Sequence, residues 1–269
     1  MKNVESVRPN HLLKKWSTDT PTLNGWLAIP DGSSAEVMAN AGWDSVTIDM
    51  QHGLIDYQSA VDCLRAISTT NTVPMVRVPW LDPAIIMKML DAGAYGIICP
   101  MISTEEEARC FASFCRYPPR GIRSTGPIRA SLYGGSTYQQ HADNLVLSLA
   151  MIETLEGMKN LDGICGVEEL DGIYIGPSDL SLAHGFKPGF DREEPEMLKA
   201  IEKVIAATRR AGKYLGIHCG SVAYGKRMID MGATMITVGS DLRFIAAGAG
   251  ETVKSFGKSI STVPDIKGY

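Results

Sequence analysis

The feature that most constrains this chain is a regular alternation of short apolar segments with longer amphipathic ones. Eight segments are short, apolar on both faces and mostly rich in Ile and Val, which is typical of strands in a buried parallel sheet. We predict strands at residues 25–29, 45–49, 75–78, 96–100, 146–153, 172–175, 214–218 and 235–238.

Amphipathic segments that lie between these strands predict eight helices. We place them at residues 33–41, 57–69, 83–92, 104–115, 155–165, 194–211, 221–231 and 242–255. Several have helix start signals: Thr104 precedes three glutamates, as in a capping box, and Asp82 precedes a proline. Glycines such as Gly93 and Gly232 follow helix ends, where a left-handed residue is expected.

Eight strands and eight helices in about 250 residues predict a single (β/α)8 barrel. We assign residues 1–269 to one domain, with a core at about 24–256. An open doubly wound sheet is the rival fold, but the turn at residues 29–33 is not a Gly-rich nucleotide fingerprint. Two excursions interrupt the alternation: residues 116–143, which are rich in Pro and Gly, and residues 183–192. A connection as long as the first is usually functional or part of an interface.

Composition weighs against some classes of partner. A net charge of −4 and a pI near 5.8 provide no basic field for nucleic acid or an anionic membrane. The six cysteines form no CxxC pair, so we expect them to be reduced and structural. Residues 1–8 lack the apolar core of a signal peptide, and no apolar run is long enough to cross a membrane. We therefore expect a cytoplasmic protein.

Active sites of (β/α)8 barrels lie at the C-terminal ends of the strands, where the following loops converge. The polar residues predicted at those ends are Asp49, Gln51, His52, Arg77, Glu153, Ser178, Asp179, His218, Ser240 and Asp241. None is a lysine, which argues against a Schiff-base mechanism.

Glu153 and Asp179 follow neighbouring strands and together suit a hard divalent cation such as Mg²⁺ or Mn²⁺. The competing interpretation is that both carboxylates are caps or salt-bridge partners. Arg77, in an otherwise apolar strand, either forms an internal salt bridge or binds a carboxylate or oxyanion in the barrel mouth. His52 is either a solvated loop residue or a group that transfers protons near neutral pH.

A different interpretation comes from the glycines of residues 219–221 and 238–241. They could build a phosphate site after the last two strands, in which case the substrate would be phosphorylated. Gly-Ser at a helix start is also an ordinary cap, so this pattern is weak.

From residue 25 to residue 244 the sequence resembles the HpcH/HpaI aldolases, a family of metal-dependent pyruvate aldolases with a (β/α)8 barrel. The matching blocks occur in the family's order: Ile48-Asp49-Met50-Gln51-His52-Gly53, Val76-Arg77-Val78-Pro79, Asp91-Ala92-Gly93-Ala94, Arg116-Tyr117-Pro118-Pro119-Arg120-Gly121-Ile122-Arg123, Ile152-Glu153-Thr154 and Gly176-Pro177-Ser178-Asp179-Leu180-Ser181.

This resemblance implies a function and a set of site residues. It implies that Glu153 and Asp179 bind Mg²⁺, Mn²⁺ or Co²⁺ and that Arg77 contacts the keto or enolate oxygen of pyruvate. His52 would then be the acid/base at the aldol hydroxyl, with Asp49 beside it and Asp91 orienting it. The backbone amides of the turn Gly176-Pro177-Ser178-Asp179 would hold the substrate carboxylate. The implied reaction is reversible cleavage of a 4-hydroxy-2-oxo acid to pyruvate, or a pyruvate analogue, and an aldehyde.

The chain departs from many members at three positions. Gln51 replaces a carboxylate, Met50 a glycine and Met151 a glutamine. The family also implies a homo-oligomer, commonly a hexamer built from three dimers that exchange the last helix. Arg123 either reaches a neighbouring active site or braces its own loop. Two alternatives remain: an acyl-CoA lyase of the same superfamily, and a non-catalytic protein that binds keto acids.

Overall fold

A computed structural model describes residues 7–258. The prediction made for the N-terminal residues 1–8 therefore falls largely outside the described part. Within residues 7–258, no helix is both long enough and apolar enough to cross a membrane.

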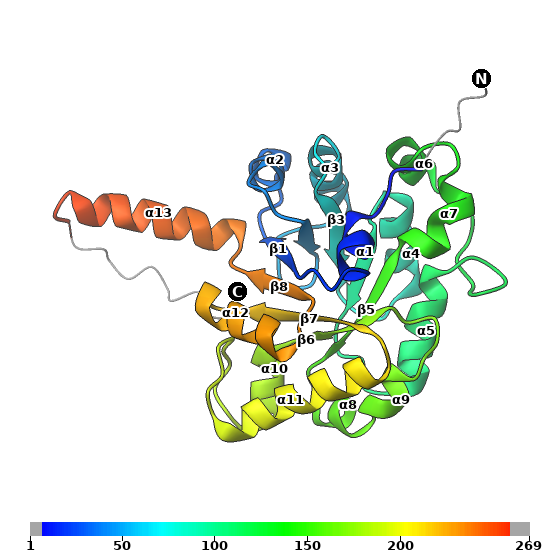
Figure 1. Cartoon of the computed structure of the whole chain (residues 1–269). Coiled ribbons are helices and arrows are strands. Elements are labelled where there is room, and N and C mark those ends of the chain that lie inside the picture. The colour runs from blue at the N-terminus through cyan, green and yellow to red at the C-terminus, as the bar shows by residue number, and fades with distance from the viewer. Residues whose placement is uncertain (1–6, 259–269) are drawn as a thin grey trace.

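Eight parallel strands close into a barrel in sequence order, and the first strand pairs with the last (Figure 1). They are β1 (Thr22–Leu27), β2 (Ser45–Asp49), β3 (Val73–Arg77), β4 (Gly96–Cys99), β5 (Leu147–Ile152), β6 (Gly172–Ile175), β7 (Tyr214–Cys219) and β8 (Met235–Val238). The predicted (β/α)8 fold is confirmed, and each predicted strand overlaps an observed one.

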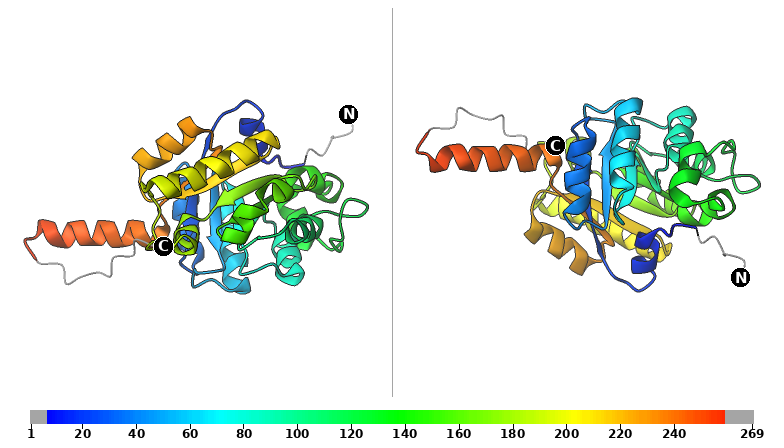
Figure 2. Two further views of the ribbon diagram at one scale, coloured as in Figure 1. Left: turned by 90° about the horizontal axis from the view of Figure 1, so that it is seen from below. Right: turned by 90° about the horizontal axis from the view of Figure 1, so that it is seen from above.

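The helices surround the barrel (Figures 1 and 2). They are α1 (His11–Trp16), α2 (Gly32–Asn40), α3 (Tyr57–Ile67), α4 (Pro83–Asp91), α5 (Glu105–Cys115), α6 (Ile128–Gly134), α7 (Tyr138–Leu145), α8 (Leu155–Lys159), α9 (Leu161–Cys165), α10 (Pro177–Ala183), α11 (Pro195–Arg210), α12 (Val222–Met231) and α13 (Asp241–Ser255). The predicted capping box at Thr104 is present, and Gly93 and Gly232 have φ values of 106° and 112°.

The structure corrects the helix prediction in several places, and α10 at Pro177–Ala183 forms where only a turn was expected. The predicted helix at residues 155–165 is broken at Asn160 into α8 and α9, and the side-chain amide of Asn160 donates to the carbonyl of Ser103. The long connection before β5 is present, but it contains α6 and α7, which were not predicted. Both are short, and the Pro and Gly residues before them masked their periodicity.

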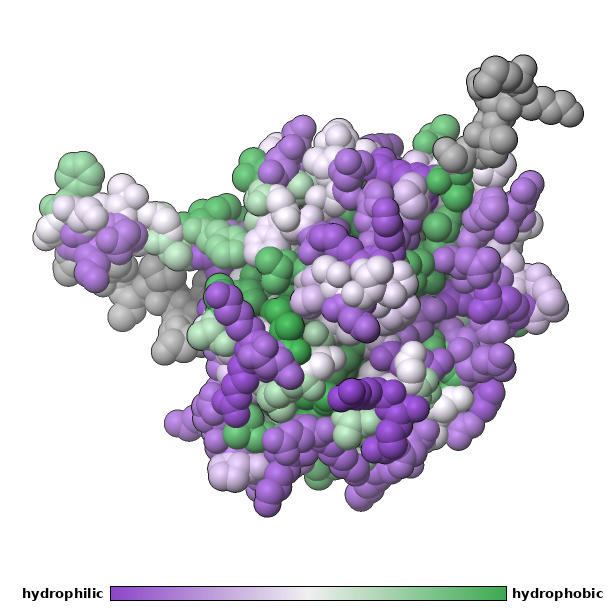
Figure 3. Space-filling model, viewed as in Figure 1, coloured by the Kyte–Doolittle hydropathy of each residue, from purple (hydrophilic) through white to green (hydrophobic). Residues whose placement is uncertain are grey.

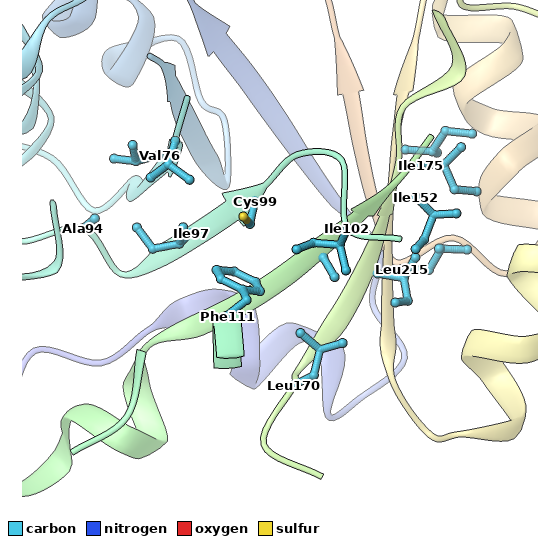
Figure 4. Packing of buried hydrophobic residues seen from close by; sticks show 14 of the residues in the cluster. Val76, Ala94, Ile97, Cys99, Ile102, Phe111, Ile152, Leu170, Ile175 and Leu215 are labelled. Atoms are coloured by element: carbon cyan, nitrogen blue, oxygen red, sulfur yellow. The ribbon is translucent and has the colours of Figure 1, made fainter. Parts of the chain in front are cut away.

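Side chains alternate between two packed layers. Outward-facing residues of the strands pack against the helices, as Figure 4 shows for Phe111 of α5 beside Ile97 and Cys99 of β4. Inward-facing residues fill the barrel and include Trp26, Met75, Tyr174 and Met235. The barrel is therefore a packed core and not a pore.

The N-terminal end of the barrel is closed by α1, which was also not predicted. Asn10, which caps this helix, donates to the carbonyl oxygens of Tyr95 and Leu145, just before β4 and β5. Trp16 is buried, and its indole N–H donates to Thr22 Oγ1 at 3.0 Å. A functional cavity must therefore lie at the opposite, C-terminal end of the strands.

Candidate active site

A cavity at the C-terminal end of the barrel brings together most of the predicted site residues. It is lined by Arg77, Met151, Glu153, Tyr174, Gly176, Pro177, Ser178, Asp179, Phe190 and His218. These residues come from β3, β5, β6 and β7 and from the loops that follow them. No lysine is among them, as the sequence predicted.

Below this cavity lies a layer of hydrogen-bonded polar side chains. Asn24 accepts from Ser45 Oγ at 2.8 Å and Thr47 Oγ1 at 3.0 Å, and it donates to Thr237 Oγ1 at 2.9 Å. The Tyr174 hydroxyl bonds the same threonine at 2.7 Å. A buried polar network whose members all find partners holds a unique geometry, so this layer gives the site a rigid floor.

Arg77 and Asp49 form a buried pair. They are register partners on β3 and β2, and Arg77 donates from Nε to Oδ1 at 2.8 Å and from Nη2 to Oδ2 at 2.6 Å. Burial acts against the ionised form of Asp49, but the Arg77 charge holds its pKa below the usual range. Trp26 covers the pair: its N–H donates to Asp49 Oδ2 at 3.2 Å, and its ring centroid lies 4.8 Å from Arg77 Cζ. Arg77 thus forms the salt bridge considered as an alternative, while still lining the cavity.

His52 is held near this pair by a tight loop. Asp49 Oδ1 accepts from the backbone N–H groups of Gln51 and His52. Gly53 completes the turn, because a Cβ atom there would lie 2.2 Å from the Asp49 carbonyl oxygen. Burial, then the charge of Arg77, lower the pKa of His52, so its imidazole is neutral at pH 7. Gln51 Oε1 is buried and has no partner among the described residues.

Glu153 follows β5 and is held in one orientation from two sides. Its Oε1 accepts from the backbone N–H of Met101 at 2.8 Å, and Met101 adopts the left-handed region with φ of 59°. Such a conformation is uncommon for a non-glycine residue and occurs often at functional sites. On the other side, a Cβ atom at Gly176 would lie 2.3 Å from Glu153 Oε2. The carboxylate therefore requires a glycine at position 176.

Glu153 and Asp179 line the cavity as two carboxylates with no lysine or arginine partner among the described residues. The guanidinium that lines the same cavity, Arg77, pairs with Asp49 instead. Burial raises the pKa of Glu153 to about 7; the Met101 hydrogen bond opposes this shift, and the charge of Asp179 adds to it. A divalent cation held by Glu153 and Asp179 would offset the cost of burying their negative charge.

The donor set also fits such an ion. No cluster of three His, Cys, Asp or Glu side chains suited to a metal occurs in residues 7–258. Two carboxylates with the remaining positions left to water or substrate suit Mg²⁺ or Mn²⁺ better than a fully protein-coordinated metal.

The start of α10 contributes polar groups that face the same cavity. The first intrahelical bond runs from the Leu180 N–H to the Gly176 carbonyl at 3.1 Å, so the N–H groups of Ser178 and Asp179 precede it. Such N–H groups have no acceptor within their own helix. Ser178 Oγ is buried and likewise has no partner among the described residues.

Asp91 is the one predicted site residue that does not join the others. It ends α4, and a helix in this fold ends at the face where the next strand begins, opposite the cavity. There it accepts from Arg123 Nη2 at 2.9 Å and lines a separate surface cavity between α3, α4 and α6. Within one chain, Asp91 and His52 lie at opposite ends of the barrel.

Carboxylates of the chain itself lie at both turns that could have bound phosphate. The Gly220 N–H donates to Asp191 Oδ1 at 2.6 Å. Asp241 accepts from the N–H groups of Ala28 and Ile29 and from Ser34 Oγ at the start of α2. The Gly220 N–H is therefore not available to a phosphorylated substrate, and the Asp241 carboxylate held at the second turn would repel a phosphate. The structure gives no support to that interpretation.

Sequence reasoning did not assign roles to four cavity or floor residues: Trp26, Tyr174, Phe190 and His218. His218 was recognised as a strand end, and its inward direction follows from the alternation along β7. Phe190 lies in the excursion at residues 183–192, and no local pattern shows that this segment folds back over the barrel.

Comparison with known proteins agrees with this geometry. Residues 25–247 match the HpcH/HpaI aldolase/citrate lyase family. The chain is 44% identical to a hydroxypyruvate/pyruvate aldolase from Rhizorhabdus wittichii, over 88% of this chain and 95% of that protein. It is 38% identical to a 4-hydroxy-2-oxo-heptane-1,7-dioate aldolase from Salmonella dublin, over 88% of this chain and 90% of that protein.

Solved structures show the same fold. A family protein from Burkholderia cenocepacia superimposes with a TM-score of 0.86 at 29% identity, covering 93% of this chain and all of that one. A citrate lyase β subunit from M. tuberculosis is more distant, with a TM-score of 0.55 and 14% identity over 82% of this chain and 93% of that one. That likeness concerns the fold alone.

Proposed function

Because the chain belongs to the HpcH/HpaI aldolase/citrate lyase family, whose aldolases are carbon–carbon lyases, we propose that it cleaves 4-hydroxy-2-oxo acids reversibly to pyruvate, or a pyruvate analogue, and an aldehyde. The observation that carries this proposal is the cavity that brings two carboxylates, Glu153 and Asp179, together with the Arg77 guanidinium, which Asp49 holds in place. The named aldolases that cover most of the chain favour a catalyst over a non-catalytic protein that binds keto acids.

The cofactor in this proposal is a divalent ion, Mg²⁺, Mn²⁺ or Co²⁺, held by Glu153 and Asp179. When bound, such an ion polarises an α-keto acid and offsets the negative charge that develops on the enolate oxygen. Arg77 would lie on the same oxygen and supply a fixed positive charge, oriented by Asp49. The N–H groups of Ser178 and Asp179, after Gly176 and Pro177, would hold the substrate carboxylate.

His52 is the proposed base. In the cleavage direction it accepts the proton of the C4 hydroxyl while the C3–C4 bond breaks, which releases the aldehyde and leaves the bonding electrons on the pyruvate enolate. Protonation at C3 then yields pyruvate. Burial and Arg77 keep His52 neutral, as a proton acceptor must be.

The location of Asp91, at the other end of the barrel from His52, supports a homo-oligomer. If Asp91 orients His52, it must come from a second copy of the chain, together with Arg123, which is bound to it. We propose a hexamer of three dimers that exchange the last helix.

The last helix, α13, supports the exchange. It projects from the barrel in Figure 1, and only Asp241 of its 15 residues is buried. Its exposed apolar residues include Leu242, Phe244 and Ile245, and Figure 3 shows hydrophobic surface where the helix leaves the barrel. A second copy would cover such a face.

Pyruvate release from 4-hydroxy-2-oxo acids tests the proposed function. We expect release with added Mg²⁺, Mn²⁺ or Co²⁺ and none after complete chelation. Asp179→Ala should abolish metal binding and cleavage, whereas Asp162→Ala, which removes an exposed carboxylate on α9, should change neither. Activity that survives removal of all metal would disprove the proposed mechanism.

A further inference from the structure

His218 is a polar side chain inside the cavity to which the proposed reaction gives no role. It lies near the end of β7, where Leu215, Ile217 and Cys219 pack outward against the helices. Alternation along the strand directs His218 inward, and it lines the cavity that also contains Arg77 and Asp179.

The imidazole is fixed by aromatic contacts and not by hydrogen bonds. Phe190 stacks on it, with ring centroids 4.4 Å apart and an interplanar angle of 17°. Trp26 meets it edge to face at 5.1 Å. Within residues 7–258, no group hydrogen-bonds either ring nitrogen. Hydrophobic packing therefore holds the ring in place and leaves its polar edge for a ligand.

The charge state of His218 limits what that ligand can be. Burial, then the charge of Arg77, lower the pKa of His218 to about 3, so the ring is neutral at pH 7. A neutral imidazole offers one N–H donor and one nitrogen acceptor. A hydroxyl group also donates and accepts, so it matches this pair, whereas a carboxylate only accepts and prefers a cation.

We propose that His218 contacts the substrate and selects for a hydroxyl group next to the bond that is made or broken. This inference rests on the proposed aldolase function. The hydroxyl can come from either of two sources: from C3 of the keto acid, as in hydroxypyruvate, or from the carbon beside the aldehyde, as in glycolaldehyde. Because Arg77 is already paired with Asp49, the cavity has no unpaired described cation for an aldehyde that carries a carboxylate.

Aldol addition by the metal-loaded full-length protein tests the inference in two arms. One arm compares glycolaldehyde with acetaldehyde as the acceptor of pyruvate; the other compares hydroxypyruvate with pyruvate as the donor to acetaldehyde. Within each arm the substrates differ by one hydroxyl, so the ratio of their kcat/KM values measures selection for it. Comparing this ratio between variants cancels the intrinsic reactivity of the substrates.

We expect His218→Phe, which keeps an aromatic ring beside Phe190, to lower the hydroxyl preference roughly 10-fold in one arm. The arm that responds identifies the source of the hydroxyl. His218→Gln keeps a donor and an acceptor and should restore part of the preference. His141→Phe makes the same change on the exposed side of α7 and should leave both ratios unchanged. If the phenylalanine variant fails to fold, His218→Leu provides the same comparison.

An unchanged ratio in both arms, or an equal loss of rate with both members of each pair, would overturn the role of His218 while leaving the aldolase function intact. A wild-type protein that turns over none of the substrate pairs with metal would instead refute the proposed function, and this inference with it.

Discussion

Arg77 and Asp49 occupy paired positions on adjacent strands and are joined by two hydrogen bonds of 2.8 and 2.6 Å. Two parallel bonds fix the plane of the guanidinium as well as its position. The direction in which Arg77 presents its remaining N–H groups to the cavity is therefore set by Asp49. Asp49 thus orients Arg77 as well as the loop that carries His52.

Replacing Arg77 with lysine should be severe although the charge is kept. An ammonium group cannot form both hydrogen bonds with a fixed orientation, so we expect kcat/KM for cleavage to fall roughly 100-fold. Arg65→Lys changes an exposed ion pair with Asp62 on α3 and should have no effect. Steady-state kinetics on both variants measures this change in kcat/KM. A wild-type kcat/KM for Arg77→Lys would contradict an orienting role for Asp49.

Gly176→Ala should weaken metal binding without unfolding the protein. The added methyl group would lie 2.3 Å from Glu153 Oε2, so the carboxylate must move. We expect affinity for Mn²⁺ to fall by roughly 10- to 100-fold, which titration calorimetry can measure. Gly248→Ala on α13 is the matched control, since no atom lies within 4 Å of its added methyl group. Equal affinities for both variants would show that Glu153 does not need its observed position.

The stability of the metal-free protein should depend on Glu153 and pH. Glu153 has a pKa of about 7 when folded against an ordinary value of 4.5, so between these values the unfolded chain loses a proton that the folded chain retains. The free energy of unfolding must then fall as pH rises through this window, by about 3 kcal/mol for this group. Above about pH 7 the free energy of unfolding has lost the whole of this contribution.

Denaturant unfolding in chelator from pH 4 to pH 8 measures this effect. Glu153→Gln should remove the loss, so its stability relative to wild type should increase with pH. Glu202→Gln, which alters an exposed carboxylate on α11, should follow the wild-type curve. Saturating Mg²⁺ should flatten the wild-type curve, because an ion beside Glu153 favours its charged form. Parallel curves for wild type and Glu153→Gln would refute the raised pKa.

Mixed oligomers should reveal whether Asp91 acts on another subunit. Asp91→Ala and His52→Ala should each be inactive alone. If the two residues meet between copies, unfolding and reassembling the variants together should restore up to about a quarter of the sites, since each restored site takes one native residue from each variant. Mixing Asp91→Ala with Asp179→Ala provides a second pair of the same kind. No recovery in any mixture, with assembly confirmed by light scattering, would rule out a shared site.

The sequence predicted the barrel well because its strand pattern is local. Each strand is a short apolar run bounded by turn residues, and all eight were found. The carboxylates and Arg77 were also placed correctly at strand ends, because barrel geometry requires only the end of a strand to be known. Short helices were missed: α1 has six residues, α6 and α10 have seven each, and α7 has eight.

Other features of the site depend on contacts between distant segments. The hydrogen bond from Met101 to Glu153 links residues 52 positions apart, and no local pattern indicates it. Asp91 shows that a predicted contact can also be absent from the folded chain. It matches a family block, yet the position of α4 places it across the barrel from His52. A motif identifies a residue, but only the packed fold shows which other residues it can reach.

The seal that α1 forms across the N-terminal end of the barrel has a kinetic consequence. With Leu12 and Trp16 buried in that end, a ligand enters and leaves through a single opening. The two products of a cleavage must then share one exit. If the keto acid is held at the strand ends by Arg77 and α10, the aldehyde lies nearer the opening and departs first. Product inhibition should accordingly be ordered, with pyruvate competing directly with the uncleaved substrate.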